Sequence, residues 1–158
     1  FLTMQYRGSD KEALQMLIDH ELAISDLYAT YANFHVDHRE YWQSLAKEER
    51  EHADTIKRLL DIIDSGKQII NTANFKPIAV KTSIDYLRQS AARARSATIP
   101  LPEALSTALD VEKAMIERKF FGIFDTASSE AQAVRKVLED GTHSHVAKLE
   151  SEWHKYRH

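Results

Sequence analysis

Five ionisable residues stand on apolar stripes that otherwise have the spacing of amphipathic helices. Glu49 and His52 lie three residues apart in the stretch KEEREHADTI (47–56), on one stripe with leucines and isoleucines. Residues three apart share a helical face, so this carboxylate and this imidazole can reach one ion or two adjacent ions. Three other helical stripes carry one such residue each near the middle: Glu21, Glu112 and His145.

Metal binding is the chemistry that this pattern favours. A carboxylate buried alone costs several kcal/mol of free energy, and three buried together repel one another. A divalent or trivalent cation removes both penalties, because carboxylates and neutral imidazoles become its ligands. Carboxylate oxygen combined with imidazole nitrogen in a helical core suits iron or manganese. The sequence therefore predicts a metal site made of Glu21, Glu49, His52, Glu112 and His145, and it identifies no catalytic residue beyond them.

Four long helices must carry these residues. The predicted helices run from the capping box of Ser9 and Glu12 to about residue 35, from Asp37 to Gly66, from Glu103 to about Phe124, and from about 129 to 156. The first and last connections are short, so each joins an antiparallel pair, whereas residues 67–101 form a connection long enough to span the bundle. A shorter helix is expected within it, in SIDYLRQSAARARSA (83–97). The predicted fold is all-α, one domain over 1–158, with a four-helix bundle over about 10–156 and one long crossover between helices two and three.

The two halves of the chain also resemble each other weakly. The segment ELAISDLYATYANF (21–34) aligns without gaps to EKAMIERKFFGIFD (112–125). Glu21 precedes His52 by 31 residues, and Glu112 precedes His145 by 33. This spacing indicates a duplicated helical hairpin in which each copy supplies a glutamate and then a histidine.

Composition excludes several other classes of site. The 158 residues include no cysteine, which removes disulfides, thiolate nucleophiles, cysteine-ligated zinc and iron–sulfur clusters. The formal net charge is −3, so we expect no nucleic-acid partner, and the basic run RQSAARARS (88–96) is interpreted as an exposed helix face. No apolar run reaches 18 residues and no signal peptide is recognisable, so we expect no membrane association and a cytoplasmic location.

The order of the ligands resembles that of a known family. The rubrerythrin-like branch of the ferritin-like di-iron carboxylate proteins has a Glu on helix one, Glu-x-x-His on helix two, a Glu on helix three and Glu-x-x-His on helix four. This chain has Glu21, Glu49-Arg50-Glu51-His52, Glu112 and Thr142-His143-Ser144-His145, and LAKEEREHADTI (45–56) is the most specific stretch. The resemblance covers about 10–156 and implies a ferritin-like bundle, a homodimer, and a centre of two iron ions, with manganese or zinc as alternatives. It also implies an oxidoreductase that reduces peroxide or O₂ or oxidises Fe(II).

Three departures from the family pattern leave the activity open. Thr142 replaces the glutamate of helix four, and Met115 stands where rubrerythrins tend to carry an additional carboxylate. The chain also lacks the cysteines of a rubredoxin module, so a peroxidase or ferroxidase of this kind would need an external electron-donor protein. The alternative is a non-enzymatic module with a mononuclear or empty site that acts as a sensor, carrier or interaction protein. An empty site with Glu21, Glu49 and Glu112 still buried predicts raised carboxyl pKa values and stability that increases as pH falls.

The remaining polar residues are not predicted to be metal ligands. Tyr28 is either a core residue or a hydrogen-bond donor to a ligand. Glu139, Asp140 and His143 point off the stripe unless Gly141 introduces a bulge. The residues expected to be solvated or on the surface are Glu48, Arg50, Glu51, His35, His38 and the terminal HKYRH (154–158).

Overall fold

The computed structural model describes the backbone of residues 2–157 and the side chains of residues 10–157. All regular elements among them are helical, which confirms the predicted all-α class. The elements in chain order are α1 (Leu2–Phe34), the 3-10 turn η1 (Val36–His38), α2 (Arg39–Asp64), α3 (Pro77–Ser96), α4 (Leu101–Glu117), the 3-10 turn η2 (Phe120–Phe124) and α5 (Ser129–Tyr156).

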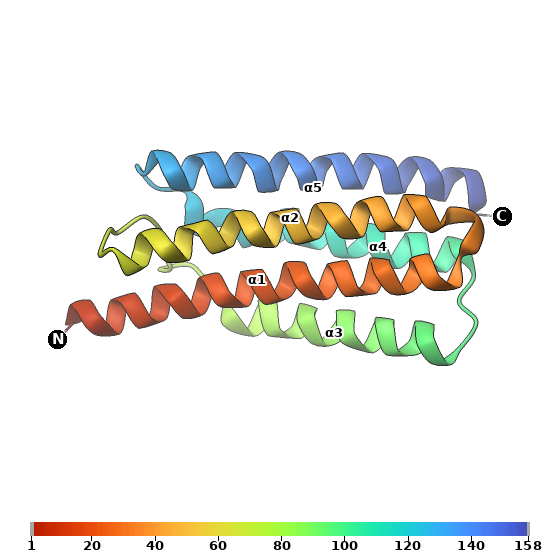
Figure 1. The fold of residues 1–158 in the computed structure, drawn as a ribbon, viewed down its shortest axis with the longest axis horizontal. Helices are drawn as coiled ribbons and strands as arrows, with labels where there is room; N and C mark the ends of the chain where they lie inside the picture. The colour runs from red at the N-terminus through yellow and green to blue at the C-terminus, as the bar shows by residue number, and fades with distance from the viewer. Residues whose placement is uncertain (1, 158) are drawn as a thin grey trace.

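Two antiparallel pairs of long helices form the body of the molecule. In Figure 1, α1 and α2 make one pair and α4 and α5 the other, and the remaining helix, α3, lies along α1. Because α3 carries the chain back along the molecule, α4 begins near the end of α1 and runs in the same direction as α2 (Figure 1). The long connection predicted between the second and third long helices therefore contains a helix of 20 residues.

The apolar stripes of these helices meet in a single core. Apolar residues recur every three or four positions, so each long helix turns one face inward and burial stabilises each large side chain by roughly 1.5–3 kcal/mol. The ring of Trp42 packs against Tyr28 and Tyr31, with ring centroids 5.5 and 4.9 Å apart. Leu22, which the spacing places on the first stripe, is 38% exposed and lies at its edge.

Three predicted helix boundaries need correction. α1 begins at Leu2, so Ser9 and Glu12 lie within it and do not start it; the side chain of Ser9 is outside the described part. α2 begins at Arg39, because residues Val36–His38 form a separate turn that contains Asp37, the predicted cap. Gly66, in contrast, follows α2 with φ 95°, the left-handed conformation that commonly ends helices at glycine.

The third long helix ends earlier than predicted. α4 stops at Glu117, and Lys119 then adopts φ 54° and turns the chain away from the helix axis. The turn η2 follows and buries four apolar side chains within five residues: Phe120, Phe121, Ile123 and Phe124. A continued α-helix would spread such consecutive residues around its circumference, so the break at Lys119 allows all four to reach the core.

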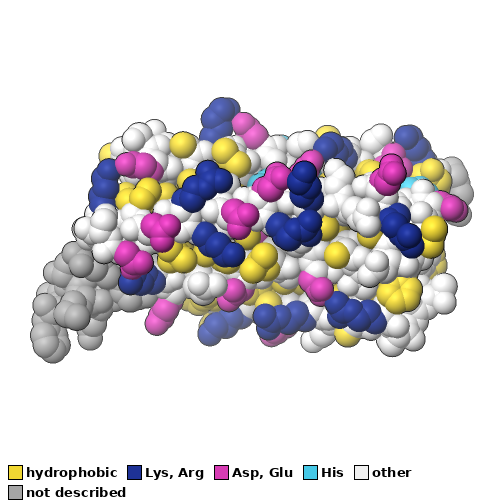
Figure 2. All heavy atoms as spheres, in the orientation of Figure 1, with side chains coloured by type: hydrophobic (Ala, Val, Ile, Leu, Met, Phe, Trp, Pro, Cys, Tyr) yellow, Lys and Arg dark blue, Asp and Glu magenta, His cyan; other side chains and the backbone are white. Residues whose placement is uncertain are grey.

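The molecular surface carries both signs of charge. On the face shown in Figure 2, basic and acidic side chains are interspersed over the helices. In the basic run of α3, Arg95 pairs with Asp26 of α1 at 2.8 Å, and Arg93 pairs with Glu103 of α4. Within residues 2–157, no helix is both long enough and apolar enough to cross a membrane.

Candidate metal centre

The structure brings all five predicted ligands together in the core. They form two groups, Glu21 with Glu49 and His52, and Glu49 with Glu112 and His145. In each group, one ligand atom from every residue lies within 4.8 Å of the others. The five side chains come from α1, α2, α4 and α5, and none is more than 7% exposed. Glu49 belongs to both groups and is the residue through which they adjoin.

The two histidines approach Glu49 from different helices. Nδ1 of His145 lies 2.8 Å from Oε1 of Glu49 and 3.1 Å from Oε1 of Glu112. Nδ1 of His52 lies 3.4 Å from Oε2 of Glu49 and 3.9 Å from Oε2 of Glu21. The imidazole rings stack with their centroids 5.7 Å apart. Each carboxylate oxygen of Glu49 thus faces one imidazole nitrogen and serves one of the two groups.

Several donor atoms at the centre have no hydrogen-bond partner, and a cation would satisfy them. With the carboxyl groups ionised, four buried site atoms have no hydrogen-bond partner among the described residues: Oε2 of Glu21, Oε2 of Glu49, Oε2 of Glu112 and Nδ1 of His52. Buried polar atoms are nearly always paired, and each unpaired one costs about 1–3 kcal/mol. A cation at each group would satisfy these oxygens and this nitrogen, which belong to the ligand types preferred by first-row metals.

In the metal-free site, bound protons neutralise part of the charge of the buried carboxyl groups. Burial raises the pKa of Glu21 well above its usual range, and burial together with Glu49 raises that of Glu112 to about 8. Burial also opposes ionisation of Glu49, but the nearby carboxyl group of Glu21 and the imidazoles of His145 and His52 outweigh it and hold its pKa well below the usual range. The expectation that all three carboxyl pKa values are raised is therefore wrong for Glu49.

The imidazole of His145 is the partner of that ionised carboxylate. Burial disfavours the imidazolium, but hydrogen bonds to Glu112 and Glu49 outweigh this effect and raise the pKa of His145 to about 11. These shifts favour protons on Glu21, Glu112 and His145 in the metal-free site, with Glu49 ionised. A metal that binds here must displace these protons, so its affinity must increase with pH.

Two residues outside the predicted ligand set hold ligands in place. The hydroxyl of Tyr28 donates to Oε1 of Glu112 at 2.8 Å while its ring packs in the core, so both readings of Tyr28 apply. Glu48 reaches Nε2 of His145 and lies 3.7 Å from Nζ of Lys148. The prediction of a solvated Glu48 is wrong, since its side chain is only 36% exposed and bonds a buried histidine. Because this contact joins two helices, the periodicity of one helix carries no signal of it.

The helix-four departure has a clear structural consequence. The hydroxyl of Thr142 donates to the carbonyl of Leu138 in its own helix at 2.7 Å, so it turns away from the ligand atoms. A Cβ atom added at the preceding Gly141 would lie 2.4 Å from Nε2 of His52. α5 continues as an α-helix through Gly141, whose missing side chain makes room for the His52 ring and not for a bulge. Met115, one turn after Glu112, is buried and apolar.

The other candidate histidines and carboxylates lie outside the two groups. Asp140 and His143 are exposed on α5 and Glu139 is partly exposed, as the helical spacing predicts. Arg50 and Glu51 are also exposed, whereas His35 and His38 are partly buried near the α1–α2 turn. Of the terminal histidines, His154 is exposed, and His158 lies outside the described residues.

Comparison of the chain with protein-family models, with curated proteins and with solved structures found no match. The conclusion that follows from the geometry is that an all-helical protein carries two buried groups of glutamate and histidine that can hold metal.

Proposed function

We propose that the protein is a non-haem di-iron protein of the rubrerythrin-like, ferritin-like group, which reduces peroxide or O₂ or oxidises Fe(II). The observation that carries this proposal is the sharing of Glu49 between two buried ligand groups. A carboxylate with one oxygen in each group is suited to bridge two ions, whereas a mononuclear site needs only one of the groups.

The arrangement of the helices supports the same reading. Ferritin-like di-iron proteins draw their ligands from four helices with one long connection between the second and third. Here α1, α2, α4 and α5 supply the ligands, and α3 lies in the connection between α2 and α4. With four helices contributing, the apolar core surrounds the site and excludes bulk water.

Each of the five ligands would have a defined role in holding the two ions. Glu21 and His52 would hold one ion, Glu112 and His145 the other, and Glu49 both. The bound iron would supply the redox chemistry, and manganese or zinc are the alternative occupants. Tyr28 fixes the orientation of Glu112, and Glu48 fixes that of His145. Electrons would come from a separate donor protein, and the functional unit would be a homodimer.

Metal content after anaerobic loading tests this proposal. The protein is incubated with Fe(II), desalted and analysed for iron per chain, beside a Glu49→Ala/His52→Ala variant. A Glu51→Ala/His143→Ala variant is the matched control, since it removes an exposed glutamate and an exposed histidine. We expect two irons per chain in the parent and the control and fewer than one in the Glu49→Ala/His52→Ala variant. No iron in the parent protein would refute the proposal.

A non-enzymatic module with one ion is the second candidate, and Thr142 favours it. Its hydroxyl bonds to its own helix and supplies no carboxylate where the family has one. One iron per chain, with no consumption of peroxide by the loaded protein, would support this reading. Two irons with turnover of peroxide in the presence of a reductant would support the enzyme.

A further inference from the structure

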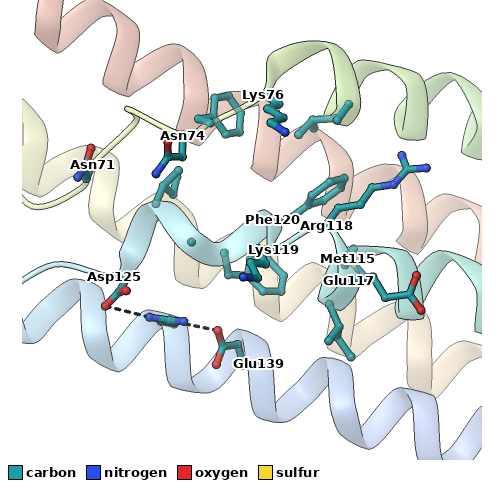
Figure 3. Close-up of a pocket in the computed structure, with 18 of the residues that line it drawn as sticks. Asn71, Asn74, Lys76, Met115, Glu117, Arg118, Lys119, Phe120, Asp125 and Glu139 are labelled. Atoms are coloured by element: carbon teal, nitrogen blue, oxygen red, sulfur yellow. Dashed lines mark hydrogen bonds and ion pairs between the residues drawn. The ribbon is translucent and has the colours of Figure 1, made fainter.

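A cleft of about 1010 Å³ lies outside the metal centre. It opens between the start of α3 and the connector before it, the end of α4 with η2, and α5 (Figure 3). None of the five predicted metal ligands lines it. The cleft is therefore a feature of the fold distinct from the two ligand groups.

Basic side chains in this cleft lack acidic partners. Lys76 comes from the edge of α3, and Arg118 and Lys119 follow α4, so the cations stand on two different walls (Figure 3). None of the three lies within 4.0 Å of a carboxylate oxygen among the described side chains. Three cations with exposed head groups and no counter-ion indicate a place for an anion.

The acidic residues of the cleft do not cancel this charge. Arg135 pairs with Asp125 at 3.1 Å and with Glu139 at 2.7 Å, and this group is joined by the dashed lines of Figure 3. The remaining carboxylate is Glu117. Over the whole lining, four basic side chains stand against three carboxylates, so the cleft has a formal charge of +1 although the whole chain has a formal charge of −3.

The same cleft has an apolar lining. Phe75 and Val80 contribute from the connector and α3, Met115 from α4, and Phe120 and Phe121 from η2. Two amides, Asn71 and Asn74, add hydrogen-bonding groups at one end (Figure 3). A site with both apolar surface and unpaired cations matches a ligand with an apolar body and an anionic head. Its concave shape favours a small molecule over the flat surface of a protein.

The backbone at Lys119 provides an independent indication. Lys119 has φ 54° and occupies the residue after the helix cap of α4, where glycine is the usual choice. Any L side chain in this conformation is strained, and strained residues concentrate at functional sites. Lysine at this position therefore makes the fold less stable than glycine would, and it places a positive charge in the cleft.

We propose that this cleft binds a small amphipathic organic anion, with an aromatic or aliphatic body against Phe120 and Phe121 and a carboxylate, sulfonate or phosphate near Lys76, Arg118 and Lys119. The proposal does not rest on the metal centre, and it holds for metal-free and metal-loaded protein alike.

Two dyes that share an anilinonaphthalene body and differ by one sulfonate group test the anionic requirement. The probes are 1-anilinonaphthalene-8-sulfonate and its uncharged analogue N-phenyl-1-naphthylamine, each titrated into the full chain and followed by fluorescence. We expect the sulfonate to bind at one site per chain, about tenfold or more tighter than the neutral dye, since one charge-assisted contact accounts for such a factor. Equal affinity for both dyes would overturn the proposal.

The variant Lys119→Gly tests whether binding needs the charge of Lys119, and it does so without destabilising the fold. This change removes both the ammonium and the strain, so we expect a higher Tm together with about tenfold weaker binding of the sulfonate and unchanged binding of the neutral dye. Lys57→Gln, an exposed change on α2 outside the cleft, is the control for net charge. Sulfonate binding that is the same in Lys119→Gly and in the parent would contradict the assignment.

Filling the cleft gives a second, independent measurement. Gly122 lines the cleft, and a Cβ added there meets no atom within 4 Å, so the backbone at this position accepts a side chain such as that of Gly122→Leu. We expect it to weaken both dyes and to leave the Tm nearly unchanged. Displacement of the sulfonate by laurate would identify a fatty carboxylate, and displacement by AMP an aromatic phosphate. Failure of both at millimolar concentration, or equal displacement by inorganic phosphate alone, would refute an amphipathic ligand.

Discussion

Replacement of Gly141 by alanine tests the geometry of the metal centre most sharply. In an ordinary helix interior this change stabilises the fold by about 1 kcal/mol, which raises the Tm of a chain of this size by roughly 2–4 °C. Here the new Cβ would lie 2.4 Å from Nε2 and 2.6 Å from Cε1 of His52, distances that real contacts do not reach. The His52 ring must therefore move when alanine is present.

The cost of that movement depends on whether a metal is bound. In the metal-free protein, Nδ1 of His52 has no hydrogen-bond partner, so the ring can leave its rotamer at a cost of about 0.5–1.5 kcal/mol. This nearly cancels the gain in helix propensity, and we expect a Tm within about 3 °C of the parent. In the metal-loaded protein, the displaced ring can no longer act as a ligand beside Glu21 and Glu49. We expect the affinity to fall at least about tenfold, or 1.4 kcal/mol.

Titration with Co(II), followed by its visible absorption and by the shift in Tm, measures both effects on one sample. Gly122→Ala is the matched control, because its Cβ meets nothing within 4 Å and the residue lies outside the ligand groups. A Gly141→Ala protein that binds Co(II) with unchanged affinity and stoichiometry would show that His52 is not a ligand in the position described.

Three other perturbations address different parts of the site. Tyr28→Phe removes one of the two donors to Oε1 of Glu112 and leaves His145 as the other, so we expect a loss of about 0.5–1.5 kcal/mol in the free energy of unfolding by urea and about 10–100-fold weaker Co(II) binding. Metal-free protein should lose stability as pH rises from about 6.5 to 8, because Glu112, with a folded pKa of about 8, keeps a proton that the unfolded chain releases near pH 4.5, and the raised pKa of Glu21 acts in the same direction. Below about pH 6.5 the lowered pKa of His20 opposes this trend. Thermal melts between about pH 6.5 and 8 measure the loss, and a flat profile there would contradict the protonated site. Thr142→Glu adds a carboxylate one turn before His145, so we expect a lower Tm without metal, tighter Co(II) binding than in the parent, and neither change in the isosteric control Thr142→Val.

Much of the site follows from helical periodicity alone. Glu21, Glu49, His52, Glu112 and His145 each interrupt an apolar stripe, and a stripe faces the core whatever the packing of the helices. Their common depth could be predicted because each stands near the middle of its segment. The contact of Glu48 could not be predicted, since it depends on how far α2 and α5 are offset along their axes.

The boundaries of the elements were less predictable for a related reason. The aromatic run after Glu117 continues the stripe of α4 in sequence, and no glycine or proline marks the break at Lys119. Tertiary burial of η2 decides that break, and local propensity does not. The cleft depends on the same turn and on the irregular connector, so sequence patterns that identify helices could not reveal it.

The two ligand groups differ more than the duplicated sequence implies. His145 is held at both ring nitrogens, by Glu49 and Glu112 on one side and Glu48 on the other, whereas Nδ1 of His52 has no partner. The difference arises on α5, where Gly141 admits the His52 ring and Thr142 supplies no carboxylate to meet it. Gly141 and Thr142 therefore leave Nδ1 of His52 without a partner, and the group of Glu21 and His52 is the one that gains most from a bound cation.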